Sequence, residues 1–316
     1  MSSRLESLLA DVAGARLSAA NLRPRPLIAL PVLGVGHGGF GGKERGEALR
    51  AQLEICLAAV GRHDIDVAIV AFQPSDYAAI QTYRRDNGLY VDLPETQRQE
   101  LAGLVERVRK GTLAIFLGAG VSMSAGLPDW NGLLTKLDES AAPASVGFGG
   151  LDSALDKAQL LRRRIGDDLG KRVAEIVGGH ERYGLSHALL AALDCPHAVT
   201  TNYDELYERA VADGHRSAEL HVLPYGALEP GNPWLVKMHG DVNHPGDIVL
   251  ARSDFVGYAA KSGPLGAVVQ SLLMTEHLLV VGASLSDDNF LRLAHEVLAF
   301  RSHTLGTVLK FSATKA

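Results

Sequence analysis

Apolar runs alternate with amphipathic segments along most of this 316-residue chain. The short apolar runs predict strands, at 26–34, 66–72, 113–118, 197–204, 234–240, 247–251, 277–285 and 306–311. Apolar residues at helical spacing predict helices, at 1–22, 43–61, 75–86, 98–109, 205–214 and 287–300, a pair over 252–275 and several between 131 and 193. Continuous apolar strands that alternate with helices are typical of parallel sheets covered on both faces. We therefore predict a doubly wound α/β fold with a mostly parallel, Rossmann-like sheet.

A polar segment, NGLYVDLPET at 87–96, is the best candidate for a linker. Before it, the segment RPRP at 23–26 ends the first predicted helix, because proline cannot continue a helix. We expect a small α/β unit in residues 1–92 and a larger domain in residues 93–316.

Composition excludes several classes of protein. The net charge of -5 argues against a general nucleic-acid binder, and the short basic cluster at 162–164 is typical of a solvated helix face. Two distant cysteines, Cys56 and Cys195, exclude a disulfide framework and a four-cysteine metal site. No signal peptide or apolar run of about 20 residues is visible. We expect a soluble, cytoplasmic protein that does not enter membranes.

Polar or glycine-containing corners follow four of the predicted strands. They are Gly118-Ala119-Gly120, Thr201-Asn202-Tyr203-Asp204, Met238-His239-Gly240 and Gly282-Ala283-Ser284. Because the carboxyl ends of parallel strands share one edge of a sheet, we expect these corners to converge on a ligand. Glycine lets backbone N–H groups approach a diphosphate, and the Ser122 and Ser284 hydroxyls could donate to phosphate oxygens. Each corner alone also has a structural interpretation: a chain reversal for the glycines, a helix cap for Asn202 and a loop histidine for His239.

A redox cofactor is disfavoured by the first corner. A dehydrogenase needs G-x-G-x-x-G and an acidic residue about 20 positions later, at the end of the next strand. After Gly118 the sequence reads GAGVSM, and the region around residue 138 is predicted to be helical. The pattern therefore argues against a redox dinucleotide site at this corner.

Four motifs, in order, resemble those of the sirtuin family over about residues 97–316. GAGVSMSAGLPDW (118–130) resembles the signature with GAG, a serine and G-[IL]-P-D before an aromatic residue, and TNYD (201–204) resembles the T-x-N-x-D corner. HG (239–240) resembles the catalytic histidine motif, and GAS (282–284) the G-T-S phosphate corner. The resemblance implies a Rossmann-like domain that binds NAD through Gly118, Ala119, Gly120, Ser122, Pro128, Asp129, Trp130, Thr201, Gly282, Ala283 and Ser284.

The departures from the family pattern are informative. Residues 241–281 contain no cysteine, which excludes the sirtuin zinc module with its two cysteine pairs. Asn131 stands where an arginine is usual, and the chain between His239 and Gly282 is too short for the usual peptide-binding domain. These features resemble the zinc-less sirtuin-like branch of bacterial antiphage defence, whose members hydrolyse NAD to ADP-ribose and nicotinamide. We expect NAD as substrate and no metal.

The resemblance also implies catalytic roles. Asn202 would hold water or the ribose near C1′, Asp204 would face the nicotinamide amide, and His239 would act as general base. An unperturbed histidine suits that task near neutral pH. Trp130 would shield the oxocarbenium-like centre.

A second glycine loop, GVGHGGFGG at 34–42, formally satisfies G-x-G-x-x-G through Gly34, Gly36 and Gly39. Asp64 and Asp66 lie near the next predicted strand, as a dinucleotide site would require. The run from 29 to 42 also resembles the later half of a macro domain, whose glycine loop holds the diphosphate of ADP-ribose. A structural α/β appendage, in which the glycines only form a tight turn, is the alternative.

Two other functions stay open at this level. One is an NAD-dependent protein deacylase, against which the missing zinc module argues. The other is a non-catalytic NAD or ADP-ribose sensor, which would not need both Asn202 and His239. We also expect a homo-oligomer or a partner defence protein, and no direct contact with nucleic acid.

Overall fold

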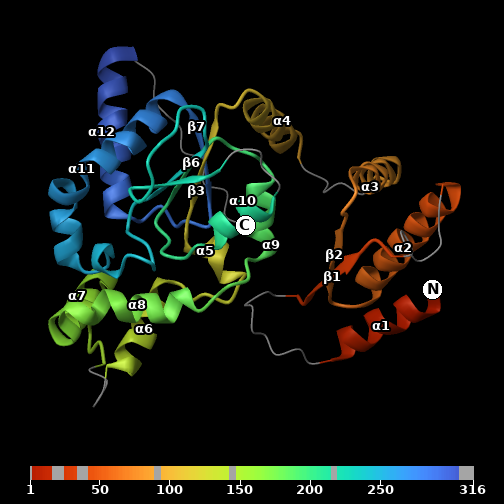
Figure 1. The fold of residues 1–316 in the computed structure, drawn as a ribbon, viewed down its shortest axis with the longest axis horizontal. Coiled ribbons are helices and arrows are strands. Elements are labelled where there is room, and N and C mark those ends of the chain that lie inside the picture. The colour runs from red at the N-terminus through yellow and green to blue at the C-terminus, as the bar shows by residue number, and fades with distance from the viewer. Residues whose placement is uncertain are drawn as a thin grey trace. The chain divides into compact units, whose positions relative to one another are not determined.

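The computed structural model describes residues 2–15, 25–33, 42–88, 94–141, 147–214 and 219–305. The chain divides into two compact units, Met1–Arg98 and Gln99–Ala316 (Figure 1). Three features of the sequence lie outside the described residues: half of the predicted linker (89–93), the glycine loop at 34–41 and the last predicted strand (306–311). The predictions for these segments stay predictions.

The first unit is a small α/β arrangement around a two-stranded parallel sheet. Its elements are α1 (Ser2–Gly14), β1 (Leu27–Pro31), α2 (Gly42–Arg62), β2 (Asp66–Val70) and α3 (Pro74–Asp86). Leu27 pairs with Asp66 and Pro31 with Val70. Helix α1 is held by Leu5 and Leu9, which are buried against α2 and the sheet. The alternation of strands and helices predicted for this part of the chain is confirmed.

The second unit contains a five-stranded parallel sheet with the strand order β5-β6-β4-β3-β7. The strands are β3 (Leu113–Leu117), β4 (His197–Thr200), β5 (His221–Leu223), β6 (Trp234–Lys237) and β7 (His277–Val281). The predicted α/β fold with a mostly parallel sheet is confirmed. The strand predicted at 247–251 is wrong: a 3₁₀ turn, η2 (Pro245–Asp247), leads into this segment, whose apolar residues pack on helices instead of pairing in the sheet.

Helices cover both faces of this sheet. The further helices of the chain are α4 (Glu95–Arg109), α5 (Ala119–Met123), α6 (Trp130–Ser140), α7 (Ala154–Ile165), η1 (Gly166–Asp168), α8 (Leu169–Gly178), α9 (Leu185–Ala191), α10 (Leu206–Asp213), α11 (Arg252–Thr275) and α12 (Asp288–Leu305). In Figure 1, α11 and α12 lie on one side of the sheet, and α9 and α10 lie on the other. Side chains of β3 alternate accordingly: Ala114 and Phe116 pack toward α11 and α12, and Ile115 packs toward α9 and α10.

Helices α6, α7 and α8 form a separate layer with its own apolar cluster, which includes Leu134, Leu161 and Val173. The predicted helical pair at 252–275 is confirmed: α11 consists of two helical segments that meet at non-helical backbone at Ser262. Pro264 accounts for this kink, because its ring clashes with the preceding turn. Within the described ranges, no helix is long and apolar enough to cross a membrane.

The strand order changes direction beside β3, and this determines where a ligand can bind. The chain moves from β3 to β4 on one side, and later crosses to β7 on the other side. In register, Leu117 pairs with Thr200 and with Val281, so these three strands end at the same level. The connections that follow β3 and β7 therefore diverge from a common crevice, the usual ligand position in an open α/β sheet.

Candidate active site

The glycine corners after β3 and β7 pack directly against each other. The Gly118 N–H donates to Val281 O and the Gly120 N–H to Gly282 O, both at 2.9 Å. A Cβ atom on Gly118 would lie only 2.4 Å from Gly282 O. The glycines are thus required for the approach of two backbones. This corrects one expectation, because the N–H groups of Gly118 and Gly120 are donated to protein carbonyls and are not free for a diphosphate.

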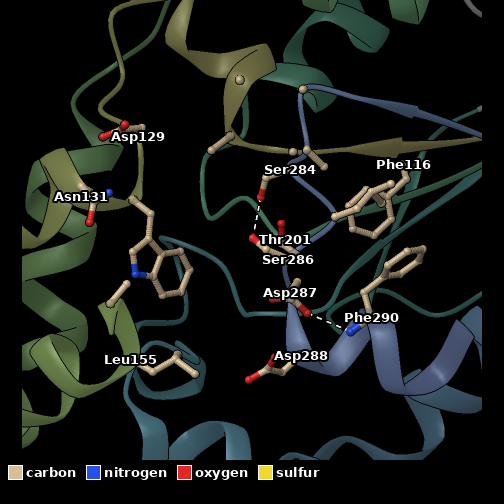
Figure 2. Close-up of a pocket in the computed structure, with 18 of the residues that line it drawn as sticks. Phe116, Asp129, Asn131, Leu155, Thr201, Ser284, Ser286, Asp287, Asp288 and Phe290 are labelled. Carbon is tan, nitrogen blue, oxygen red and sulfur yellow. Dashed lines mark hydrogen bonds between the residues drawn. The ribbon is translucent and has the colours of Figure 1, made fainter. Parts of the chain in front are cut away.

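A cavity of about 510 Å³ opens beside these corners, within the range typical of small-molecule sites. Figure 2 shows it between two walls, with Asn131 and Leu155 on one side and Ser284 and Asp287 on the other. The predicted residues that line it are Gly118, Ala119, Gly120, Asp129, Trp130, Thr201, Gly282, Ala283 and Ser284. The sequence analysis did not predict several other lining residues: Phe116, Met123, Ala154, Leu155, Phe255, Leu285, Ser286, Asp287, Asp288 and Phe290.

A smaller cavity of about 60 Å³ adjoins the large one. The two share four lining residues: Ala119, Asp129, Trp130 and Thr201. The remaining predicted residues of the first two motifs (118–130 and 201–204) line the small cavity, namely Ser122, Pro128, Asn202 and Asp204. The fold therefore brings the glycine corners and the polar 201–204 corner to two cavities that share a wall.

The start of α6 forms the wall common to both cavities. Asp129 caps this helix, because its carboxylate accepts the Gly132 N–H at 2.8 Å. Trp130 is the first helical residue, and its ring meets Phe255 of α11 edge-on at 6.3 Å between centroids. The G-L-P-D-W tail of the first motif thus places an aromatic ring at the junction of the two cavities.

Ser122 is committed to the protein. It is buried on α5, and its hydroxyl donates to Asp204 Oδ2 at 2.8 Å. Ser122 Oγ also lies 3.1 Å from Asn202 Nδ2 and 3.2 Å from His187 Nε2. A serine has one proton to donate, so this arrangement leaves none for the phosphate contact that we expected. Asp204 is occupied on its other oxygen as well, which accepts the Leu206 N–H at 3.0 Å.

His239 is fully buried and lines neither cavity. Its Nε2 lies 3.3 Å from Asp287 Oδ2, and its ring meets Phe255 at 5.1 Å and Tyr258 at 6.1 Å between centroids. Phe255 and Asp287 do line the large cavity. The predicted convergence of all four corners is therefore only partly realised, because the His239 side chain lies behind the cavity wall.

Asp287 is the residue of the wall that contacts His239. Its Oδ1 accepts the Phe290 N–H at 2.8 Å, which caps α12 (Figure 2). Burial raises the pKa of Asp287, but His239 and the N–H groups of Phe290 and Asn289 outweigh burial and hold the pKa below its usual value. An ionised carboxylate thus lies between the histidine and the cavity. In the sequence, Asp287 resembles an ordinary helix cap, so its contact with His239 could not be expected.

The buried side chain of Lys237 holds the 201–204 corner in place. Lys237, at the end of β6, donates to the carbonyl oxygens of Tyr203 at 3.2 Å and Asp204 at 2.6 Å. Its Nζ also pairs with Asp241 and lies 3.0 Å from Glu208 Oε1. Burial raises the pKa of Glu208 to about 7, although Lys237 opposes this rise. The corner is therefore anchored to β6 and α10 through one side chain.

Thr200 is a further residue that the sequence analysis missed. Its hydroxyl donates to Leu117 O and accepts the Asn202 N–H, both at 2.9 Å. It occupies the first position of T-x-N-x-D, which we had matched from Thr201. Among the described residues, no group of three or more histidine, cysteine or acidic side chains is arranged to hold a metal ion.

Comparison with known proteins matches a family model described as SIR2-like domain to residues 196–314. The chain is 30% identical to the NAD(+) hydrolase ThsA of Enterococcus faecium over 205 residues, which are 61% of this chain and 41% of that protein. It is also 30% identical to the NAD(+) hydrolase ThsA of Bacillus cereus, over 58% of this chain and 39% of that protein.

A further relative is named Defense-associated sirtuin 2, from Bacillus subtilis; it is 26% identical over 59% of this chain and 19% of that protein. The chain spans about two fifths of the length of the ThsA relatives that it matches. The matched region, 196–314, contains the Asn202, His239 and Gly282 corners. These residues therefore lie in the region that matches a SIR2-like domain, and the resemblance of the sequence motifs to sirtuin-like proteins is confirmed.

Proposed function

We propose that this protein hydrolyses NAD to ADP-ribose and nicotinamide. The observation that carries the proposal is the pair of cavities that share a wall at the point where the strand order reverses, with Asn202 beside the smaller one. Crevices at such points are the usual nucleotide sites of open α/β sheets. Relatives named NAD(+) hydrolase support the same reaction.

The proposed hydrolysis breaks one bond, forms one bond and releases one proton. The bond between ribose C1′ and the nicotinamide nitrogen breaks, its electron pair returns to the ring, and nicotinamide leaves as a neutral molecule. A water oxygen then bonds to C1′ and one proton is released. The carboxylates of Asp287 and Asp288 in the large cavity attract the cationic nicotinamide, and Asn202 holds the water. We assign proton uptake to the pair of His239 and Asp287, because Asp287 joins the buried histidine to the cavity.

Turnover of NAD by the purified chain tests the proposal, with ADP-ribose and nicotinamide separated by chromatography. Asn202→Ala and His239→Ala should abolish turnover, because each removes a group assigned to the water or its proton. Asn232→Ala is the matched control: Asn232 precedes β6 and contacts His221, away from both cavities. Full turnover in both site variants would refute the assignment. Release of acyl groups from a labelled acyl-peptide, without free NAD hydrolysis, would indicate a deacylase instead.

We also propose that the hydrolysis serves antiphage defence, in line with the relative named Defense-associated sirtuin 2. Cells that express the chain should lose NAD on phage infection, and cells that express the Asn202→Ala variant should not. Equal NAD levels in infected cells of both kinds would contradict this role.

A further inference from the structure

His187 of α9 is a buried histidine that neither the motifs nor the proposed reaction accounts for. The residue is only 1% exposed to solvent. The Gly184 N–H donates to its Nδ1 at 3.2 Å. A backbone N–H can only donate, so Nδ1 is the unprotonated nitrogen and the proton of the neutral ring is on Nε2.

The direction of the next two hydrogen bonds follows from this tautomer. Nε2 lies 3.2 Å from Ser122 Oγ and must donate to it. The Ser122 hydroxyl then donates its own proton to Asp204 Oδ2 at 2.8 Å, because a carboxylate accepts. Burial lowers the pKa of His187, and the Asp204 carboxylate offsets this only in part. The ring thus stays neutral and keeps its single donor on Nε2 near neutral pH.

The amide of Asn202 is oriented from the other end of the same network. Its Nδ2 lies 3.1 Å from Gly118 O, a carbonyl that can only accept. The second proton of Nδ2 points to Ser122 Oγ, also at 3.1 Å. Ser122 then accepts two hydrogen bonds and donates one, which uses its full capacity. A flipped amide would place Oδ1 against the Gly118 carbonyl and remove a donor from Ser122.

This orientation leaves Oδ1 of Asn202 for a ligand. Among the described residues, no hydrogen bond to Oδ1 is made, and Asn202 lines the small cavity. We propose that His187 is a positioning residue: through Ser122 it fixes the Asn202 amide so that Oδ1 accepts a hydrogen bond from a hydroxyl or a water at this cavity. The inference rests on the proposed hydrolysis and specifies it, since the group held there is a donor, either the attacking water or a ribose hydroxyl.

Activity of three variants tests the inference. His187→Phe keeps a ring but loses both nitrogens, and should lower kcat for NAD about 10- to 100-fold with little change in KM, because the amide loses its fixed geometry. His187→Gln can restore a donor to Ser122 and should recover most of the turnover. His197→Phe is the matched control, since His197 lies at the opposite end of β4 and pairs with Glu276. It should leave kcat unchanged.

If His187→Phe fails to fold, Ser122→Ala provides the test, and it should lower kcat by a similar factor. Equal kcat in wild type, His187→Phe and Ser122→Ala would overturn the inference, as would a His197→Phe variant that loses as much kcat as His187→Phe.

A spectroscopic measurement separates this inference from the proposed hydrolysis. Long-range ¹H–¹⁵N correlation spectra of the wild-type chain should show His187 as a neutral ring with its proton on Nε2. A proton on Nδ1, or a charged ring at neutral pH, would overturn the network whether or not NAD is hydrolysed. Absence of NAD turnover together with the Nε2–H tautomer would refute the hydrolase proposal and, with it, the positioning role, while the geometry of the amide would stand.

Discussion

Replacement of Lys237 by methionine should destabilise the second unit severely. The side chain is fully buried, and its Nζ serves two carbonyl oxygens and two carboxylates, Asp241 and Glu208. Methionine fills a similar volume but supplies no donor. Both carboxylates and the Tyr203 and Asp204 carbonyls would then stay buried without their cation.

The expected loss is about 3–5 kcal/mol, the usual cost of removing one partner from a buried ion pair. This is a large fraction of the roughly 5–15 kcal/mol that stabilises a typical protein. The loss should shrink as the pH falls. Burial already raises the pKa of Glu208 to about 7 from an ordinary 4.5, and loss of Lys237 would raise it further. At a pH between 4.5 and this raised pKa, Glu208 binds a proton in the folded variant but not in the unfolded chain. Lowering the pH in this range therefore stabilises the folded variant.

Urea unfolding followed by tryptophan fluorescence measures this change. Both tryptophans of the chain, Trp130 and Trp234, lie in the second unit, so the signal reports that unit. Lys171→Met is the control, because Lys171 forms an exposed pair with Asp168, and it should leave the unfolding midpoint unchanged. A Lys237→Met midpoint equal to that of the control, or a loss that grows on acidification, would refute this account of the buried network.

Two further predictions concern the cavity walls. Gly282→Ala places a Cβ 2.5 Å from the Val121 nitrogen at a φ of +68°, so the corners must separate, and NAD turnover should fall more than about tenfold in a steady-state assay; unchanged turnover would contradict the close packing. Phe255→Ala removes the ring that lies 5.1 Å from His239, and His239 should become reactive toward diethylpyrocarbonate, as read by peptide mass spectrometry; a histidine that stays unreactive would show that Phe255 does not cover it.

Most strands could be predicted because they are continuous apolar runs, and such runs are buried on both faces in a parallel sheet. The same logic was wrong at 247–251, where Ile248 and Leu250 are buried by helices and make no sheet pairing. Strand β5 was not predicted, since three residues at the sheet edge carry too little pattern.

The candidate site could be predicted only in part. Glycine and polar corners after strands are visible in the sequence, because the strands are parallel and their carboxyl ends share an edge. The partners of each corner are not visible, since they come from elements distant in sequence. His187 lies 65 residues from Ser122, and no local pattern relates them.

The order of motifs along the chain was sufficient to identify the SIR2-like region and the parallel α/β fold, because motif spacing and apolar periodicity are local properties. The contacts of the corner residues follow only from the tertiary structure. The N–H groups of Gly118 and Gly120 donate to carbonyl oxygens at the end of β7, and His239 lies behind Asp287. The tertiary structure also orients the amide of Asn202, since the direction of a hydrogen bond depends on which donors and acceptors the fold brings together.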